Sequence, residues 1–341
     1  MRSIDLSALD PTDFSLLNDW QRDFPLQPRP YAHIGACRGL SVDQVLARYR
    51  RLERDGLISR IGAVFAPRRL GASALAALAV PPERLEEVAA RVSREPAVNH
   101  NYQREHPYNL WFVLTAASEA GLQAVVAGIV RDTGFVPIVL PMEEEFHIDL
   151  GFDLRTRPAV ARRVPVSPHF APSGLSGSAQ ALIQALQGGL ELVPAPFAAL
   201  GARAGCDEAS TLAQLGAWVE SGLIRRFGVI VHHHELGFEA NAMCVWDVSD
   251  ERVSALGRAL AAEPAVTLCY RRRRALPHWR YNLYCMIHGR EREEVLAIRK
   301  ALQQRLGLDA CPHAVLFSTR RYKQTGAQYL ASPAGREEGH G

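Results

Sequence analysis

Three side chains with different chemistry occupy alternate positions near residue 100. His100, Tyr102 and Arg104 are separated by single residues. If this segment is a β-strand, the three side chains point to the same face, because side chains along a strand alternate with a period of two. The pattern predicts an imidazole, a phenol and a guanidinium along one surface, with His106 and Tyr108 across the turn on the returning strand.

A second charged hairpin is expected in the other half of the chain. Arg271–Arg274 form an unbroken run after Tyr270, and His278, Tyr281 and Asn282 follow it. Arginine binds carboxylates through two hydrogen bonds and stacks on flat rings, while tyrosine and tryptophan offer apolar faces to a planar ligand. Together the hairpins indicate a site for a flat, conjugated molecule with several carboxylates. Taken alone, the arginine run could equally be a solvated loop.

The two hairpins belong to two copies of one repeated sequence. Three segments recur in the same order: Gly56–Gly62 as Gly222–Gly228, Glu95–Val98 as Glu263–Val266, and Tyr108–Trp111 as Tyr281–Tyr284. The offset grows between segments, as expected when loops lengthen after a duplication. Differences between the copies should therefore mark the working surface, and one of them is that His100 corresponds to Leu268.

Each copy is predicted to begin with a winged helix-turn-helix. Ser41 to Gln44 has the sequence of a capping box, and apolar residues recur at helical spacing up to Leu52. After Gly56, Ile58–Phe65 alternates as a short pair of strands would. The second copy repeats this pattern, with helices at 196–204 and 207–221 and strand residues at 223–231.

The remainder of each copy alternates between strand and helix patterns in the order βαββαβ, which indicates a ferredoxin-like module. The expected strands and helices are 75–80, 83–94, 97–104, 108–115, 119–131 and 136–147 in the first copy, and 240–248, 250–262, 266–272, 280–288, 292–305 and 312–321 in the second. The predicted fold class is α+β, a tandem duplication of a winged helix-turn-helix plus a ferredoxin-like module. The predicted domains are a winged helix-turn-helix at 12–66, a ferredoxin-like module at 67–154, a linker at 155–178, their second copies at 179–232 and 233–330, and a disordered tail at 331–341.

The composition is that of a globular protein, and we expect the protein to be cytoplasmic. The chain has 341 residues, 48% of them hydrophobic, and a net charge of +3, which is too small to indicate nucleic-acid binding by itself. Its six cysteines show no regular spacing, which favours unpaired thiols in a reduced compartment. We expect no signal peptide, no membrane span and no membrane partner.

DNA binding is the first alternative that a helix-turn-helix raises. Arg48, Arg50, Arg51 and Arg54 could neutralise phosphates from the second helix of the first copy. The equivalent helix of the second copy, Asp207–Gly222, contains no lysine or arginine. A DNA-binding protein with two-fold symmetry needs both of its recognition helices to be able to contact DNA. We therefore expect no DNA partner and interpret the helix-turn-helix as a scaffold.

The element order resembles that of the Lrp/AsnC family of regulators, which are DNA-binding dimers with a ligand-responsive second domain. A more specific resemblance lies in two motifs. The run His100–Phe112 resembles one subunit of siroheme decarboxylase, and the run Cys269–Gly289 resembles its partner subunit. Phe317–Gly326 is similar to that partner's C-terminal strand. The resemblance spans about Asn18 to Tyr329 and implies a natural fusion of the two Lrp/AsnC-like subunits.

This resemblance implies the decarboxylation of siroheme to 12,18-didecarboxysiroheme in the synthesis of d-type haem. CO2 would leave the acetate side chains of two pyrrole rings. No cofactor is expected, because the substrate carries its own iron, and no protein metal site is expected, since the adjacent residues His232–His234 make a poor metal cage. The expected partners are siroheme, its product, a second copy of the chain and other proteins of d-type haem synthesis. An Lrp/AsnC-type regulator and a tetrapyrrole carrier remain the alternatives.

The candidate residues divide into two roles. His100 is the first candidate for proton donor, with Tyr102 or His106 as a second donor or orienting group. His100 could instead bind the iron of the substrate, and His147 could reach the site. The residues expected to bind substrate are Arg104, Tyr108, Asn109, Trp111, Tyr270, Arg271, Arg272, Arg273, His278, Tyr281, Asn282, Arg320, Arg321 and Lys323. Which copy catalyses stays open.

Overall fold

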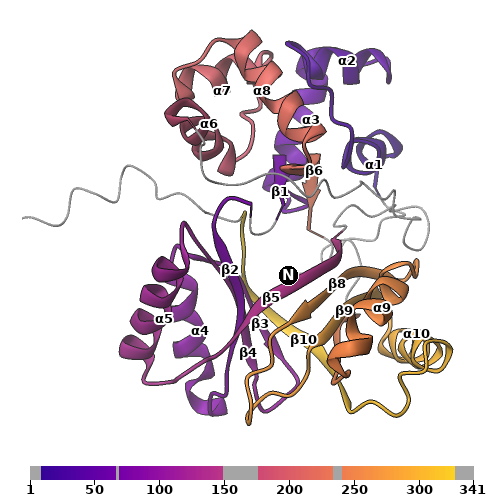
Figure 1. Ribbon diagram of the computed structural model, residues 1–341. Helices are drawn as coiled ribbons and strands as arrows, with labels where there is room; N and C mark the ends of the chain where they lie inside the picture. The colour runs from indigo at the N-terminus through magenta and orange to yellow at the C-terminus, as the bar shows by residue number, and fades with distance from the viewer. Residues whose placement is uncertain (1–8, 67–68, 149–175, 233–239, 327–341) are drawn as a thin grey trace, which may run out of the picture. The chain divides into compact units, whose positions relative to one another are not determined.

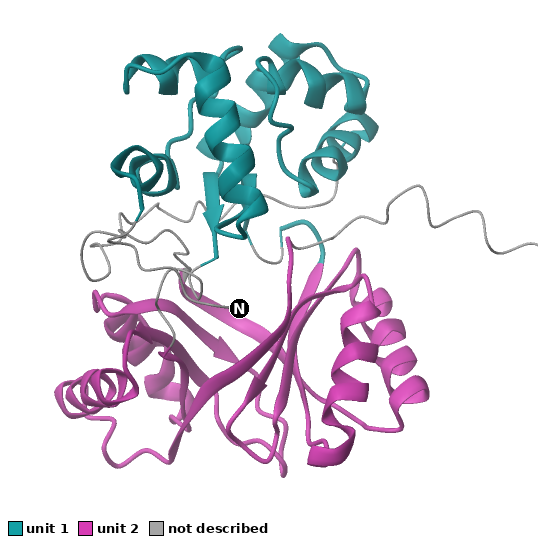
Figure 2. Ribbon diagram, turned by 180° about the vertical axis from the view of Figure 1, so that it is seen from behind, with its two compact units in different colours: residues 1–71, 163–236, 328–341 teal, residues 72–162, 237–327 magenta. Residues whose placement is uncertain are grey.

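The structure, a computed structural model, describes residues 9–66, 69–148, 176–232 and 240–326. The chain divides into two compact units, and each combines the corresponding parts of the two copies (Figure 2). Unit 1 comprises Met1–Gly71, Arg163–Leu236 and Gln328–Gly341, and unit 2 comprises Ala72–Arg162 and Gly237–Ala327. Most of the expected linker, the tail at 331–341, and His233 and His234 lie outside the described residues.

Unit 1 contains both helix-turn-helix segments. Its helices are α1 (Pro11–Asn18), α2 (Pro30–Ala36) and α3 (Val42–Arg54) from the first copy, and α6 (Gly177–Gln187), α7 (Pro196–Ala204) and α8 (Glu208–Glu220) from the second. The predicted capping box is confirmed, since Ser41 Oγ accepts from the Gln44 amide at 3.2 Å and Gln44 Oε1 accepts from the Ser41 amide at 2.8 Å. The buried face of α3 is formed by residues at helical spacing: Val45, Leu46, Tyr49 and Leu52.

The predicted strand pair within each wing was wrong. Ile58–Phe65 forms a single strand, β1, which pairs antiparallel with β6 (Ile224–Val231) of the other copy. Gly62 faces Gly228 in this ladder. An alternating pattern identifies a strand but not its partner, and here the partner is the equivalent segment of the second copy.

Unit 2 confirms the βαββαβ order in both copies. The first copy provides β2 (Ala72–Leu78), a 3₁₀ turn η2 (Pro82–Arg84), α4 (Leu85–Arg94), β3 (Val98–Arg104), β4 (Leu110–Ala116), α5 (Glu119–Thr133) and β5 (Ile138–Ile148). The second provides β7 (Ala240–Trp246), α9 (Asp250–Ala261), β8 (Val266–Arg272), β9 (Leu283–Gly289), α10 (Arg292–Arg305) and β10 (His313–Gln324). Each copy folds as a four-stranded antiparallel sheet with two helices on its outer face.

The two sheets of unit 2 close on each other to form a barrel. β5 pairs with β8 and β10 pairs with β3, so the strand order is β10-β3-β4-β2-β5-β8-β9-β7. Helices α4 and α5 lie on one side of the strands and α9 and α10 on the other (Figure 1). One core lies between each sheet and its helices. A third core, formed by both copies, fills part of the barrel interior and includes Leu75, Trp111, Leu140, Val245, Tyr284 and Leu316.

None of the helices in the described segments combines the length and the apolar character needed to cross a membrane.

Candidate active site

The inner face of β3 carries the predicted row of polar side chains. Asn101 points outward, because its side-chain amide donates to Ala89 O of α4 at 3.1 Å. Its neighbours on the strand therefore point into the barrel. The rings of His100 and Tyr102 are stacked with centroids 6.2 Å apart, and the Arg104 guanidinium lies 5.9 Å from the Tyr102 ring centroid. The prediction that these three side chains share one face is confirmed.

Arg104 is a buried cation with one donor left over. Its Nη1 donates to Leu316 O at 2.9 Å, and only 8% of the residue is exposed. Its Nε has no hydrogen-bond partner among the described residues. Burial lowers the pKa of Arg104 to about 10, so the guanidinium stays charged near neutral pH. A charged donor without a partner in a barrel interior is suited to an anionic ligand.

Arg272 repeats this arrangement in the second copy. Its Nη1 donates to Leu140 O at 2.9 Å, and its guanidinium lies 5.0 Å from the ring centroid of Tyr270 and 5.9 Å from that of Tyr284. Its Nε also lacks a partner within the described part of the chain, and burial lowers its pKa. The duplication thus places two buried guanidinium groups in one barrel with matching contacts.

The two copies differ in where they carry an imidazole. Leu268 replaces His100 on β8, whereas His288 lies on the inner face of β9, opposite Asn241 of β7. His288 Nδ1 lies 2.9 Å from Thr267 Oγ1, and burial, with the charge of Arg104 second, lowers the pKa of His288 to about 4. Sequence reasoning missed His288, although it alternates in phase with Tyr284 and Met286, both of which pack in the interior core.

A further interior group joins Tyr102 to β10. The Tyr102 hydroxyl and Arg321 Nη1 both donate to Gln324 Oε1 at 3.2 Å. Arg321 was predicted from sequence, but Gln324 was missed. The register of β10 against β3 brings these residues together, because Arg321 pairs with Tyr102 and Gln324 pairs with His100.

His106 lies away from this group. It follows β3 and contacts Trp279 of the second copy, with ring centroids 5.2 Å apart. Its Nδ1 accepts from the Tyr108 amide at 3.0 Å, and burial lowers its pKa. A strand advances about 3.3 Å per residue, so the Arg104 end of β3 lies about 13 Å from His100, and His106 follows that end in the turn. The two imidazoles are therefore not brought to one reacting atom. His106 and Tyr108 belong to the turn, since β4 begins at Leu110.

The aromatic cluster around Trp279 joins the two hairpins. Trp279 Nε1 donates to the Tyr284 hydroxyl at 2.6 Å, and the Trp279 ring contacts Trp111 at 5.0 Å and Tyr281 at 4.9 Å between centroids. Trp111 Nε1 donates in turn to Tyr108 O at 2.6 Å. Tyr108 and Trp111 of the first copy and Tyr281 of the second, all predicted, therefore meet around Trp279, which was not predicted, at the hairpin end of the barrel.

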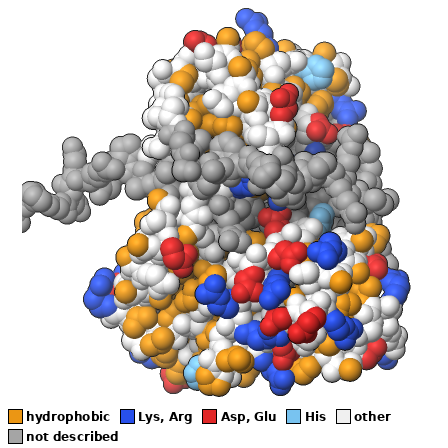
Figure 3. All heavy atoms as spheres, in the orientation of Figure 1, with side chains coloured by type: hydrophobic (Ala, Val, Ile, Leu, Met, Phe, Trp, Pro, Cys, Tyr) orange, Lys and Arg blue, Asp and Glu red, His pale blue; other side chains and the backbone are white. Residues whose placement is uncertain are grey.

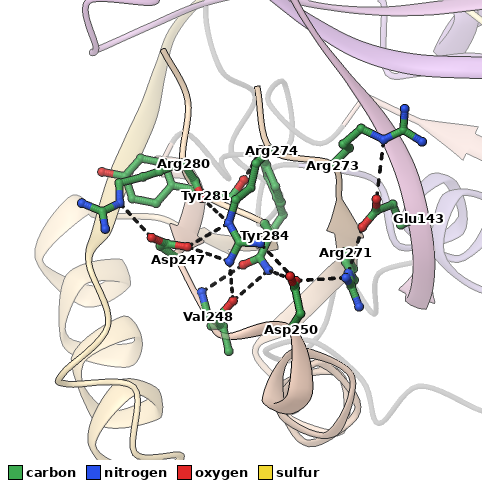
Figure 4. Close-up of polar contacts among 11 residues, drawn as sticks. Glu143, Asp247, Val248, Asp250, Arg271, Arg273, Arg274, Arg280, Tyr281 and Tyr284 are labelled. Atoms are coloured by element: carbon green, nitrogen blue, oxygen red, sulfur yellow. Dashed lines mark hydrogen bonds and ion pairs between the residues drawn. The ribbon is translucent and has the colours of Figure 1, made fainter. Parts of the chain in front are cut away.

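The consecutive arginines do not converge, contrary to the sequence-based expectation (Figure 4). Only Arg272 points inward, since neighbouring side chains on a strand alternate. Arg271 pairs with Glu143 at 2.9 Å and Asp250 at 3.0 Å, and Arg273 is 69% exposed and 3.6 Å from Glu143. Acidic and basic side chains are intermingled on the face of unit 2 that carries α9 and α10 (Figure 3).

Four predicted site residues bind other groups of the protein, and a fifth is exposed. Asn109 and Asn282 each bind a backbone, because their side-chain amides donate to Val80 O and Val248 O at 2.8 Å and 2.9 Å. Arg320 pairs with Glu86 of α4 at 2.7 Å, and Lys323 donates to Glu95 O at 2.9 Å. His278 is exposed in the β8–β9 loop. These side chains are not gathered with His100 and Arg104.

Comparison with known proteins places this fold and site in a family. Residues 69–147 and 235–323 match the AsnC-like ligand binding domain, and residues 13–58 and 179–225 match the siroheme decarboxylase NirDL-like HTH domain. The siroheme decarboxylase NirDL subunit of Paracoccus denitrificans is 45% identical over 324 residues, which cover 94% of this chain and 98% of that protein. The chain belongs to the siroheme decarboxylase family.

Within this family the chain has the fused NirDL form. The siroheme decarboxylase NirD subunit of Pseudomonas aeruginosa is 52% identical over 146 residues, which cover 97% of that subunit but 43% of this chain. A crystal structure of the siroheme decarboxylase NirDL in complex with an iron-uroporphyrin III analogue matches with a TM-score of 0.66 and 28% identity, covering 93% of each chain. The predicted fusion of two related subunits is confirmed.

In this member of the siroheme decarboxylase family, three arginines of α3 contact other residues of unit 1. Arg48 pairs with Asp13 at 2.7 Å, and Arg51 pairs with the same carboxylate, which is buried. Arg50 donates to Leu192 O at 2.6 Å. α8 carries neither lysine nor arginine. The helices that would contact DNA thus offer it little uncompensated positive charge.

Proposed function

We propose that this chain is a carboxy-lyase that removes CO2 from two acetate side chains of siroheme and releases 12,18-didecarboxysiroheme. The proposal is carried by one observation: the interior row of His100, Tyr102 and Arg104, in a chain that matches siroheme decarboxylases along nearly its whole length. The tetrapyrrole analogue bound to the related NirDL structure supports a macrocyclic substrate.

Each decarboxylation needs a proton but no oxidant. The bond between the acetate methylene and its carboxylate breaks, CO2 leaves, and the electron pair stays on the methylene carbon, where the conjugated macrocycle delocalises it. A proton then adds to that carbon and completes a methyl group. An imidazole is suited to deliver this proton near neutral pH. His100 is the proposed donor, with the Tyr102 ring stacked beside it.

The buried arginines are proposed to anchor carboxylates that remain on the macrocycle. Arg104 and Arg272 each have an Nε donor without a partner within the described residues, and a charged donor in a low-dielectric interior binds an anion strongly. Anchoring the leaving carboxylate as tightly would stabilise the substrate and slow the reaction. The arginines therefore hold the macrocycle while a different carboxylate is lost.

The proposal includes no cofactor besides the iron and the conjugated ring of the substrate. The six cysteines, all within the described residues, are free thiols, which supports a reduced compartment such as the cytoplasm. The strands of unit 2 pair with one another in a closed barrel, so a homodimer, or a complex with other proteins of d-type haem synthesis, would use surfaces other than these strand edges.

Anaerobic incubation with siroheme, followed by mass spectrometry of the pigment, tests the proposal. The wild-type chain is expected to yield pigment that has lost two CO2 units. His100→Ala should slow this loss more than it weakens pigment binding, whereas His313→Ala, at an exposed position on β10, should behave as wild type. Pigment that binds tightly but stays unchanged would overturn the proposal in favour of a carrier.

A further inference from the structure

An asparagine inside the barrel has no part in the reaction as described so far. Asn241 is the second residue of β7 and pairs with His288 of β9. It points inward, because its neighbours Ala240 and Ala242 lie in the core between the sheet and its helices, and side chains alternate along a strand. The side-chain oxygen of Asn241 is buried and has no hydrogen-bond partner among the described residues. Buried polar groups are usually paired, so this amide is suited to a ligand.

The strand register places Asn241 at the same level of the barrel interior as Arg104. Arg104 pairs with Ser318 of β10. Phe317, which precedes Ser318, pairs with Ala242 in the antiparallel β10–β7 ladder. Ser318 therefore lies next to Asn241 where that ladder ends. Asn241 and Arg104 thus occupy the two strands that flank β10, one on each side of the same residue.

The Arg104 guanidinium extends over β10 in the direction of Asn241. Its Nη1 donates to Leu316 O of β10 at 2.9 Å, which holds the group away from its own strand. Its charge also acts on His288 of β9, one strand beyond Asn241. Arg104 is 8% exposed, and its Nε lacks a partner within the described residues. A buried cationic donor and a buried amide therefore adjoin the same part of the interior.

We infer that Asn241 and Arg104 bind one carboxylate that stays on the macrocycle, each through an N–H group. This inference rests on the proposed function, because it takes siroheme as the ligand. The terminal torsion of an asparagine side chain is broad, so the amide can turn Nδ2 towards an anion. A carboxylate has two oxygens and can accept from both donors. The arginine supplies the charge that the neutral amide lacks.

The repeat offers a comparison, because the equivalent of Asn241 in the first copy is Ser73 of β2. Met142 of β5 pairs with Arg272, and the register of β2 against β5 places Met142 next to Ser73. Arg104 therefore has an asparagine at the position where Arg272 has a serine. A serine side chain is shorter and has a single donor, so the two arginines differ in the anion site that they can complete. The fold also accepts serine at this position of the repeat.

Binding of siroheme to variants of the full chain tests the inference, with anaerobic quenching of tryptophan fluorescence as the measurement. Asn241→Ser, which copies the residue of the first repeat, should bind about tenfold more weakly, as expected when a hydrogen bond to a charged group is lost. Asn241→Asp puts a negative charge beside the carboxylate, so affinity should fall about 100-fold or more. A retained carboxylate is bound alike before and during the reaction, so the loss should appear in KM rather than in kcat.

Gln103→Glu is the matched control for the added charge. Gln103 adjoins Arg104 but lies on the outer face, where its Oε1 accepts from the Tyr322 hydroxyl at 3.4 Å, so this variant should bind siroheme as wild type does. The double variant Arg104→Lys/Asn241→Ser should lose less affinity than the product of the two single losses, because both side chains contact one carboxylate. Circular dichroism should show that each variant is folded.

The outcomes for the inference and for the proposed function are distinguishable. Wild-type affinity in Asn241→Asp, an equal loss in Gln103→Glu, or fully multiplicative losses in the double variant would overturn the inference. Affinity that depends on Asn241 in a chain that leaves siroheme intact would refute the proposed function alone. Turnover by the wild-type chain, with siroheme affinity unchanged in Asn241→Asp, would refute the inference alone.

Discussion

At the scale of single residues, the strongest indication of a ligand site is that the barrel interior contains two buried arginines, Arg104 and Arg272. Burying a guanidinium is unfavourable unless its donors are satisfied. Arg104 and Arg272 each have one backbone carbonyl and a nearby tyrosine ring, which offset part of that cost. A buried donor left without a partner costs about 1–3 kcal/mol. Both copies of the repeat have an arginine Nε without a hydrogen-bond partner among the described residues, as expected for a group that an anionic ligand completes.

Replacing Arg104 with lysine tests this role. The Arg104→Lys variant keeps a positive charge but loses the planar, two-donor geometry. Siroheme affinity should fall about 10- to 100-fold, which matches the loss of about 1.5–3 kcal/mol expected for a hydrogen bond to a charged group. The measurement is a fluorescence titration with the pigment. Arg320→Ala, on the outer face beside Glu86, is the matched control, and an equal loss in both variants would contradict the assignment.

Single-residue placement was predictable where strand alternation alone decides it. His100, Tyr102 and Arg104 were placed correctly by that rule, and the same rule separates Arg272 from Arg271 and Arg273. The roles of Asn109 and Asn282 were not predictable, because they depend on carbonyls of Val80 and Val248 that are distant in sequence. The repeated asparagine before β4 and β9 was the signal of a structural contact shared by the copies.

At the scale of elements, Arg274 makes the largest set of side-chain hydrogen bonds in the loop between β8 and β9. Arg274 donates to Asp247 at 2.8 Å and 2.9 Å, to Arg280 O at 2.9 Å and to Val248 O at 2.5 Å (Figure 4). The loop that it closes carries Trp279 into the aromatic cluster of the first copy. Arg274 thus positions a side chain of one copy against the turn of the other.

Loss of this arginine should loosen the hairpin. Arg274→Ala removes the hydrogen bonds to Arg280 O, Val248 O and Asp247, although Asp247 keeps Arg280 as a donor and Val248 O keeps Asn282. The free energy of unfolding should therefore fall by about 1–3 kcal/mol, and tryptophan fluorescence should shift to the red as Trp279 becomes solvated. Urea unfolding followed by fluorescence measures both effects. The neighbouring variant Arg273→Ala removes an exposed side chain with one long ionic contact and should change stability by less than about 0.5 kcal/mol. Equal losses of stability in the Arg274→Ala and Arg273→Ala variants would refute the role of Arg274 in positioning the hairpin.

The β1–β6 ladder gives a second prediction at this scale. A Cβ on Gly228 would lie 2.4 Å from the backbone oxygens of Trp20 and Gln21. Gly228→Ala should therefore destabilise unit 1 by about 1–3 kcal/mol, as overpacking does. Gly216, inside α8, has open space around it, and Gly216→Ala should stabilise by about 0.5–1 kcal/mol. Thermal unfolding compares the two substitutions, and a Gly228→Ala variant as stable as wild type would contradict the close approach.

At the scale of the whole molecule, the two copies of the repeat share one fold but differ in the side chains that they carry inside the barrel. The order of helices and strands was predictable because it depends on local periodicity, as in β8 (Val266–Arg272) and α10 (Arg292–Arg305). The pairings β1–β6, β5–β8 and β3–β10 were not, because each joins segments from different copies. The repeated sequence was enough to locate both copies. The structure adds that their sheets close into one barrel, to which the two copies contribute histidines at different positions.

The central claim is that this chain converts two acetates of siroheme into methyl groups with protons supplied at an interior site. Anaerobic turnover in deuterium oxide, followed by mass spectrometry of the pigment, tests it most directly. The account predicts a product that has lost two CO2 units and gained one solvent deuteron in each new methyl group. Recovery of intact siroheme from a folded, pigment-bound protein would contradict it.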